Sequence, residues 1–385
     1  MSAKQGILDA AVANADVPFV VAAQGNAAGV TWSGAAGEAA PGRAAGMDTV
    51  YRIFSMTKAV GSTAAMMLVD RGKIGMDDPV DMHLPEMAAN LRVLEGWDGD
   101  TPTYRAPASM PTLRQLSTHT SGLVYEFWCP EIGEWMQKTG HPTVISGLDA
   151  SLNYAMAFDP GERWDYGIGI DWLGKVVEAV DGRRIDVFLQ EELFGPLGMS
   201  DTACEVGDHM AGRLAGVKAR GEDGAFGDTE LAPPPSPEFY GMGHALYSTP
   251  ADYLTFIRLF LNGGTMNGHK VMSEDSVEKM LANSIGDLRI GKMTSLAPPM
   301  SADVELFPGT PMTHSFGFVR NEMDVPEMRT AGSQGWAGVL NSHYWFDPAK
   351  DVAAVIMTQS LPFADPRFMG TYEAFEKAVY AEMAA

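Results

Sequence analysis

The order of the expected elements predicts an α+β fold, an α/β sandwich in which both ends of the chain build one antiparallel sheet. Apolar, β-prone stretches lie at 19–23 near the start and at 339–346 and 352–359 near the end, while helical patterns fill most of the middle. Strands at both ends predict a sheet closed by the two termini and flanked by helices, with a mainly helical domain inserted. We expect an α/β domain at 1–74 and 238–385 and the helical domain at 75–237.

The first strands follow from short apolar runs separated by turn residues. Phe19–Ala23 is β-prone, and Gly25-Asn26 favours a turn that pairs it with Gly29–Ser33 as a hairpin. A further short strand, Val50–Ile53, leads into a helix from about Ser55 to Arg71.

The remaining elements are assigned from periodicity, caps and breakers. In the middle segment helices are expected at Thr112–Thr118, Ser146–Met156, Ile170–Val180 and Ile185–Phe194. Later helices are expected at Pro250–Asn262, Ser273–Asn283 and Glu373–Glu382. Strands are expected at Ser315–Arg320, Met328–Ala331, Val339–Phe346 and Val352–Gln359. The span 284–312 is rich in Gly, Pro, Met and Ser and predicts a long loop.

Composition excludes several classes of protein. The 385 residues are 46% hydrophobic and 20% charged, near the globular average and unlike disordered, collagenous or coiled-coil chains. A net charge of −22 argues against a nucleic-acid or anionic-membrane partner. The longest apolar run, 59–69, is too short to span a bilayer. No secretory signal pattern opens the chain, so we expect a cytoplasmic protein.

The two cysteines, Cys129 and Cys204, allow at most one disulfide, and we expect both to be reduced. Neither belongs to a Cys/His cluster with zinc spacing, so no metal and no organic cofactor are expected.

The most specific chemical pattern is Ser55-Met56-Thr57-Lys58 at the start of a helix. A serine and a lysine three residues apart share one helix face. A serine hydroxyl is a weak nucleophile that needs an adjacent base, and a lysine can supply one. Ser276-Val277-Glu278-Lys279 has the same spacing, but its acidic neighbours favour a solvated helix face.

A second pattern, Asp159-Pro160-Gly161 followed by an aromatic cluster, places Tyr166 on a loop. Tyr166 is either an anchor for this loop or, beside Ser55 and Lys58, a proton shuttle hydrogen-bonded to Lys58. The residues alone leave both interpretations open.

Together these motifs resemble the serine β-lactamase and penicillin-binding-protein superfamily in its class C-like branch, most similarly the family VIII carboxylesterases. The resemblance runs nearly end to end through short motifs in a fixed order. They are Ser55–Lys58, Leu68–Ile74, Asp77–Val80, Thr112–Leu123, Pro160–Tyr166, Pro196–Met199, Ser248–Tyr253 and Trp345–Pro348. It implies a β-lactamase/transpeptidase-like fold, with Ser55 as the acylated nucleophile and Lys58 and Tyr166 as its base system.

The departures from the family pattern concern substrate binding. Ile168 stands where β-lactamases carry an asparagine that grips the substrate amide. The third family motif falls on Trp336-Ala337-Gly338, without the cation that would hold a β-lactam carboxylate. The resemblance further implies an oxyanion hole from the backbone N–H groups of Ser55 and Val339.

The expected substrate pocket comprises Trp336, Ala337, Gly338, Ile168 and Met56, with Met293, Met300 and Met312 bordering it from the long loop.

These features predict a serine carboxylesterase acting on short-chain acyl esters, with a small-molecule ester as its partner. Acyltransferase, amidase or weak β-lactamase/DD-peptidase activity would use the same three residues. A catalytically idle binding or sensor module is a more distant alternative.

Overall fold

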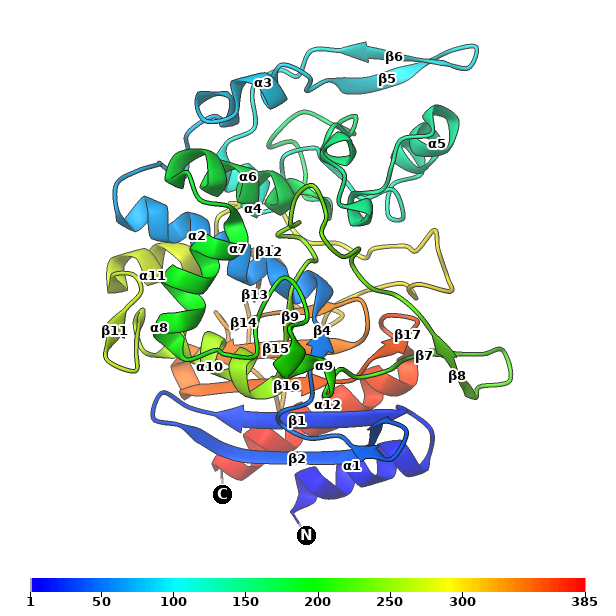
Figure 1. Ribbon diagram of the computed structural model, residues 1–385, viewed down its shortest axis with the longest axis vertical. Coiled ribbons are helices and arrows are strands. Elements are labelled where there is room, and N and C mark those ends of the chain that lie inside the picture. The colour runs from blue at the N-terminus through cyan, green and yellow to red at the C-terminus, as the bar shows by residue number, and fades with distance from the viewer. Residues whose placement is uncertain (1, 385) are drawn as a thin grey trace.

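A computed structural model describes residues 2–384 of the chain, and its centre is an eight-stranded antiparallel sheet (Figure 1). The strand order is β12-β13-β14-β15-β16-β1-β2-β3, so the two ends of the chain meet where β1 pairs with β16. The strands are β1 (Phe19–Gly25), β2 (Val30–Ala40), β3 (Arg43–Ala44), β12 (Met312–His314), β13 (Val319–Asn321), β14 (Gln334–Gly338), β15 (Ser342–Asp347) and β16 (Val352–Met357). The predicted fold class, the N-terminal hairpin and the closure of the sheet by both termini are confirmed.

Helices cover both faces of this sheet. On one face α1 (Ala3–Ala13) and α12 (Pro366–Ala384) pack together, and Leu8 and Phe375 contact the side chains of Val20 and Trp345. On the other face lie α2 (Thr57–Asp70) and α10 (Pro250–Leu261), against alternate residues such as Val21. Because helices cover both faces of the sheet, both alternating sets of side chains in β1 are buried, and its first five residues, Phe19–Ala23, are all apolar.

The segment 75–237 holds short helices and two hairpins. Most of its first part, up to about residue 181, lies above α2 in Figure 1, whereas 185–229 extends beside and below α2. Its helices are α3 (Pro85–Ala88), α4 (Leu113–Ser117), α5 (Pro130–Thr139), α6 (Gly169–Asp181), α7 (Ile185–Leu189), α8 (Gly195–Leu197) and α9 (Asp208–Ala211), with a π-helical turn at Gln190–Phe194. Its strands are β5 (Val93–Asp98), β6 (Thr101–Arg105), β7 (Val217–Arg220) and β8 (Phe226–Thr229). The domain boundaries proposed from the sequence stay a prediction.

Several predicted elements are wrong. Ser146–Met156 is not a helix, because only the 3₁₀ turns Val144–Ser146 and Asp149–Leu152 form there. The expected strand Ser315–Arg320 is only partly correct, because residues 315–318 form the turn between β12 and β13, where Gly317 has a φ of 104°, and only Val319 and Arg320 belong to β13. Met328–Ala331 forms no strand. Helix α1 and strand β14 were not predicted.

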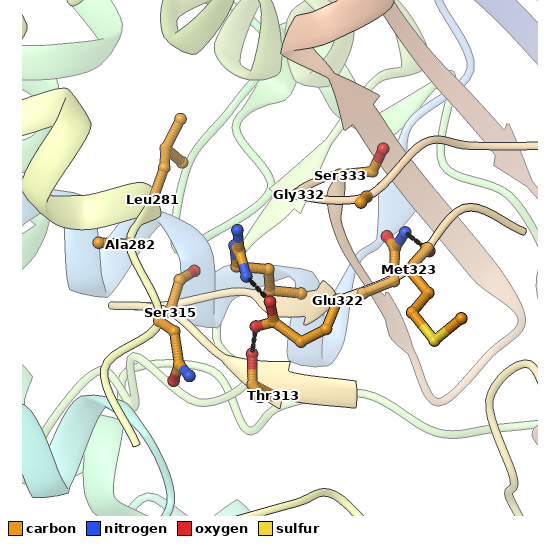
Figure 2. A network of polar contacts seen from close by, with 12 residues as sticks. Leu281, Ala282, Thr313, Ser315, Glu322, Met323, Gly332 and Ser333 are labelled. Atoms are coloured by element: carbon orange, nitrogen blue, oxygen red, sulfur yellow. Dashed lines mark hydrogen bonds and ion pairs between the residues drawn. The ribbon is translucent and has the colours of Figure 1, made fainter. Parts of the chain in front are cut away.

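The β12–β13 hairpin is fixed to the start of β14 by polar contacts (Figure 2). Within the hairpin Thr313 donates a hydrogen bond to Glu322, as Figure 2 shows. From the turn, Ser315 Oγ donates to Gln334 Oε1 at 2.7 Å and so connects the hairpin to β14. Gln334 Nε2 in turn donates to the carbonyls of Leu281, at the end of α11 (Glu274–Leu281), and Gly332, both at 3.0 Å. These bonds set the position of β14, the strand that carries Trp336.

The smaller pairings and one remaining feature complete the fold. β4 (Tyr51–Arg52) pairs with β9 (Tyr247–Ser248), β10 (Thr265–Met266) with β11 (His269–Lys270), and β17 (Ser360–Leu361) with β7. The long loop expected at 284–312 contains no helix or strand before β12. Within residues 2–384, no helix combines the length and apolarity that a membrane span requires.

Candidate active site

Ser55 sits in a tight 3₁₀ turn, Phe54–Met56, that joins β4 to α2. Phe54 has a φ of 39°, a strained value for a residue with a side chain, and Tyr253 Oη donates to the carbonyl of Met56 at 2.8 Å. Lys58 follows in the first turn of α2, and its Nζ donates to Ser55 Oγ at 3.1 Å. The predicted pairing of the serine and lysine side chains on one helix face is therefore present.

Lys58 is almost completely buried, and three acceptors surround its Nζ. Besides Ser55 Oγ, Nζ donates to Tyr125 Oη at 2.9 Å and to the carbonyl oxygen of Gly243 at 2.8 Å. The rings of Tyr125 and Tyr166 lie 5.0 and 4.8 Å from Nζ, at cation–π distance. These contacts hold the amine in one position beside Ser55 Oγ.

The two tyrosines meet because two loop segments run antiparallel. Val124 bridges Gly167, and the N–H of Tyr125 donates to the carbonyl of Tyr166 at 3.0 Å. A Cβ at position 167 would lie 1.8 Å from the carbonyl oxygen of Leu123, so only glycine allows this approach. The ring centroids of Tyr125 and Tyr166 consequently lie 5.2 Å apart, and Lys58 Nζ lies 5.0 and 4.8 Å from them.

Tyr166 is not hydrogen-bonded to Lys58 within the described chain, contrary to the sequence-based hypothesis of a direct shuttle. Its Oη instead accepts a hydrogen bond from Trp336 Nε1 at 3.0 Å, and its ring packs 4.7 Å from His119. The physical reason is geometric, since Tyr125 Oη already fills the acceptor position next to Nζ. Tyr166 keeps its own hydroxyl proton free for a group bound in the pocket.

A buried carboxylate stands behind Lys58. Asp171 Oδ1 accepts a hydrogen bond from the N–H of Gly243 at 2.8 Å, and the carbonyl of the same residue accepts from Lys58. Burial raises the pKa of Asp171 to about 6, although the charge of Lys58 acts in the opposite direction. His244 Nδ1 lies 3.6 Å from Asp171 Oδ1, and burial together with Lys58 lowers the pKa of His244 to about 3. His244 is therefore neutral near pH 7, and the two side chains form no ion pair there.

The end of β14 closes the site on the opposite side of Ser55. A Cβ at Gly338 would lie 2.3 Å from the carbonyl oxygen of Ile53, so glycine lets this strand approach the serine turn. The backbone N–H groups of Ser55 and Val339 have no hydrogen-bond partner among residues 2–384, and both residues line one small cavity. Two unpaired donors beside a nucleophile are the arrangement that an oxyanion hole requires.

This cavity, the Ser55 pocket, has a volume of about 50 Å³. Its lining residues are Ser55, Phe127, Trp128, Tyr166, Met293, Met300, Ser301, Trp336, Ala337, Val339 and Phe363. No lysine or arginine is among them, and in the described residues no cluster of three or more His, Cys, Asp or Glu side chains could hold a metal.

The structure brings most of the predicted residues together, but three of them lie elsewhere. Trp336 and Ala337 line the Ser55 pocket. Met56 and Ile168 do not, because both side chains are fully buried in the main hydrophobic core. Gly338 packs against Ile53 instead of facing the cavity.

The three methionines expected to border the pocket from the long loop line two different cavities. Met293 and Met300 line the Ser55 pocket, and Met312 lines a neighbouring cavity.

Two other serines, Ser276 of the second Ser-x-x-Lys pattern and Ser333, form hydrogen bonds away from Lys58. Ser276 is buried, not solvated as expected, and its hydroxyl donates to Asp70 Oδ1 at 2.7 Å. Lys279 forms an exposed ion pair with Asp275 at 2.6 Å. Ser333 Oγ donates to the carbonyl of Thr330 at 2.7 Å. Cys129 and Cys204 are free, buried thiols, as predicted.

Sequence reasoning missed Tyr125 and the aromatic wall formed by Phe127, Trp128 and Phe363. The run Tyr125-Glu126-Phe127-Trp128, which begins three residues after Gly122, was the available indication, since three aromatic side chains in a loop-rich stretch need a surface to contact. Phe363 lies near the other end of the chain, and no local pattern connects it to Ser55.

Fold and site together define a class: serine enzymes that transfer acyl groups. The Beta-lactamase family model matches residues 4–378, and the chain belongs to this family. The resemblance inferred from the sequence is thereby confirmed.

Individual relatives agree with this assignment. Monacolin J acid methylbutanoyltransferase of Aspergillus terreus is 29% identical over 352 residues, covering 87% of this chain and 83% of the relative. Lovastatin esterase of Penicillium rubens is 27% identical over 352 residues, covering 88% and 87%. The solved structure of simvastatin synthase from Aspergillus terreus superposes with a TM-score of 0.86 at 25% identity, covering 98% of this chain and 97% of that one.

Proposed function

We propose that the protein is a serine carboxylesterase that hydrolyses uncharged acyl esters through an acyl-enzyme on Ser55. The observation that carries the proposal is the 3.1 Å contact between Lys58 Nζ and Ser55 Oγ, in a pocket with two unpaired backbone donors. Nucleophile, base and oxyanion donors are the three parts that acyl transfer to serine requires.

The proposed reaction assigns one step to each group. In the reacting state the contact between Nζ and Oγ is reversed, so that Ser55 Oγ–H donates to the lone pair of Lys58 in its neutral form while Nζ keeps its bonds to Tyr125 and Gly243. Lys58 takes this proton and becomes charged as Oγ attacks the ester carbonyl, and the N–H groups of Ser55 and Val339 bind the developing oxyanion. When the intermediate collapses, Tyr166 donates its hydroxyl proton to the departing alcohol oxygen. The proton held by Lys58 then reaches Tyr166 through a bridging water molecule, because no direct hydrogen bond joins the two side chains. A water molecule then attacks the acyl-serine by the same route and releases the acid.

The chemistry of the pocket supports a neutral ester over a β-lactam. Trp336 and Ala337 occupy the position of the third family motif, and no cation lines the cavity to pair with a carboxylate. Burying a charge without a partner is costly, so anionic substrates are disfavoured.

The proposal is tested by activity and by covalent labelling of the same preparation. A panel of p-nitrophenyl acetate, p-nitroacetanilide and nitrocefin should show turnover of the ester. Mass spectrometry after a fluorophosphonate probe should find the adduct on Ser55, and Ser55→Ala should lose both turnover and labelling. An adduct on Ser276 or Ser333 contradicts the assignment of the nucleophile.

Acyl transfer to an alcohol is the second candidate function, because one similar relative is named a methylbutanoyltransferase and another an esterase. Both outcomes share the acyl-enzyme and differ in what attacks it. Adding an acceptor alcohol during turnover of p-nitrophenyl butyrate distinguishes them. Formation of the new ester at the expense of butyric acid identifies a transferase, and unchanged acid release identifies a hydrolase.

A further inference from the structure

The buried carboxyl of Asp171 takes no part in the reaction steps described above, and its surroundings are unusual. Asp171 lies in the first turn of α6 and is 1% exposed. Its Oδ1 accepts a hydrogen bond from the N–H of Gly243, whereas Oδ2 has no hydrogen-bond partner among residues 2–384. A buried charge without a direct partner is costly, so this carboxyl requires a physical explanation.

The other buried carboxyls of the described chain are bound directly by cations or by several donors. Asp347 accepts from Thr330 and Tyr380, Asp365 pairs with Arg220 at 2.5 Å, and Glu376 pairs with Arg329 at 2.8 Å. Asp171 differs from them, because the positive charge that acts on it belongs to Lys58, on the far side of Gly243.

The segment Gly241–His244 joins Asp171 to Lys58. The N–H of Gly243 donates to Asp171 Oδ1 at 2.8 Å, and the carbonyl oxygen of Gly243 accepts from Lys58 Nζ at 2.8 Å. A Cβ at Gly243 would lie 2.5 Å from Asp171 Oδ2, so glycine lets the backbone lie directly against the carboxyl. The carboxyl therefore fixes the backbone that carries one of the three acceptors of Lys58.

Asp171 is also the acid among the titratable side chains that interact with Lys58. Within residues 2–384 the others are Tyr125, Tyr166, His119 and His244, and of these Tyr125 and His244 also face Asp171. Burial holds the pKa of Tyr125 well above its usual range and the pKa of His119 well below its usual range. Both are therefore uncharged near pH 7, as His244 is. Burial raises the pKa of Asp171 to about 6, so its carboxyl is ionised above that pH.

We propose that Asp171 is a positioning residue for Lys58. It holds the Gly243 carbonyl that orients Nζ, and its negative charge stabilises the ammonium group that forms when Nζ takes the proton of Ser55. In this step the proton passes from Ser55 Oγ to Lys58 Nζ, and Asp171 neither gains nor loses one. The inference rests on the proposed function, in which Lys58 is the base, and it gives a role to a residue outside the Ser55 pocket.

The pH profile of Asp171→Asn is the first test, because asparagine removes the charge and keeps an oxygen that can accept the N–H of Gly243. A close opposite charge shifts a protonation equilibrium by about 1–3 pH units, and we expect about one unit here because Gly243 separates the two groups. The acidic limb of kcat/KM for p-nitrophenyl acetate should move lower by that amount, since Lys58 then releases its proton at lower pH. On the alkaline plateau kcat should fall about three- to tenfold with KM unchanged, because a weaker base reacts more slowly. Toward low pH the two enzymes should converge, because the wild type loses the charge of Asp171 there as well.

Asp252→Asn is the matched control. Burial raises the pKa of Asp252 to about 6 as well, but its Oδ2 accepts from the N–H of Asp201 at 2.8 Å and from Thr202 Oγ1 at 2.9 Å, away from Lys58. This variant should keep the acidic limb and the plateau of the wild type. Asp171→Ser also removes the charge and keeps a hydroxyl oxygen, and it replaces the asparagine variant if that variant does not fold.

The interaction between Asp171 and Lys58 can also be measured without any substrate. A ¹³C NMR titration of protein labelled at the aspartate carboxyl carbons gives the pKa of Asp171, whose signal is the one absent from the Asp171 variant. The charge of Lys58 lowers this pKa against the effect of burial, so Lys58→Met should raise it by about one unit.

The two measurements have separate meanings. A lower acidic limb in the Asp171 variant and a higher pKa of Asp171 in Lys58→Met support the proposal. An unchanged limb with kcat reduced equally at every pH would show that Asp171 is only structural, and a pKa that Lys58→Met leaves unchanged would overturn the charge interaction. A wild-type protein that hydrolyses no ester but shows the pKa change refutes the proposed function and still supports the pairing of Asp171 with Lys58.

Discussion

Replacing Tyr125 by phenylalanine removes the hydroxyl oxygen that accepts a hydrogen bond from Lys58 Nζ at 2.9 Å, while the ring contacts are kept. A hydrogen bond to a charged group contributes about 1.5–3 kcal/mol. Without it, Nζ loses one of its three acceptors, and its position beside Ser55 is less well defined. Since about 1.4 kcal/mol corresponds to a factor of ten, kcat should fall about 10- to 150-fold. KM should change little, because Tyr125 is not in the lining of the Ser55 pocket.

The assay is steady-state hydrolysis of p-nitrophenyl acetate together with the pre-steady-state burst, which separates acylation from deacylation. Tyr166→Phe gives the comparison, and it should lower kcat about 10²- to 10⁴-fold as expected for lost general acid–base catalysis. Tyr104→Phe is the control, because it removes a hydroxyl that accepts from Trp135 Nε1 at 2.7 Å, outside the Ser55 pocket. A Tyr125→Phe enzyme with wild-type kcat, or with only a raised KM, would refute the idea that Tyr125 positions Lys58.

Three further predictions follow from the site and its surroundings. Because no cation lines the Ser55 pocket, kcat/KM for p-nitrophenyl acetate should exceed kcat/KM for nitrocefin at least about 100-fold. Trp336→Lys should lower this ratio. Equal kcat/KM values for the two substrates in the wild type would contradict the prediction. Burial and the charge of Arg329 lower the pKa of His343 to about 3. As the pH falls from 6.5 toward 3, the unfolded chain binds a proton at His343 and the folded protein does not, so the free energy of unfolding decreases. The decrease between pH 6.5 and pH 5 is about 2 kcal/mol. Urea unfolding at pH 6.5 and pH 5 measures this decrease in the free energy of unfolding. The decrease should be about 2 kcal/mol smaller in His343→Phe than in the wild type. Equal decreases in both proteins would be inconsistent with a buried neutral histidine. Gly338→Ala should lower the free energy of unfolding by about 1–3 kcal/mol and reduce activity, because the new Cβ would lie 2.3 Å from the carbonyl oxygen of Ile53. A variant as stable and as active as the wild type would contradict this close contact.

The sequence by itself determined what depends on neighbours along the chain. The spacing of Ser55 and Lys58 places both side chains on one face of the first helical turn, and the structure has that geometry. The apolar, β-prone pattern of Phe19–Ala23 predicted a strand, and β1 begins at Phe19. Pro250 after Thr249 marked the start of α10, where Thr249 Oγ1 accepts a hydrogen bond from the N–H of Asp252. Caps, periodicity and short spacings are local, so a single sequence carries them.

Only the tertiary structure decided how distant segments meet. Tyr125 lies 67 residues from Lys58 along the chain, yet its hydroxyl accepts a hydrogen bond from Lys58. Trp336 lies 278 residues from Lys58, and its ring N–H donates to Tyr166 beside the same site. The first part of the expected strand Ser315–Arg320 is a turn in which Gly317 approaches Ser62 of α2 so closely that a Cβ would lie 2.5 Å from the serine side chain, a contact absent from its own sequence neighbourhood. Met56, at the end of the 3₁₀ turn, and Ile168, directly before α6, pack into the core instead of lining the Ser55 pocket. Which groups become hydrogen-bond partners, and which side chains line a cavity, depends on how distant segments of the chain come together. A hydrophobic pattern predicts that a side chain is buried, but it does not predict which residue the side chain packs against.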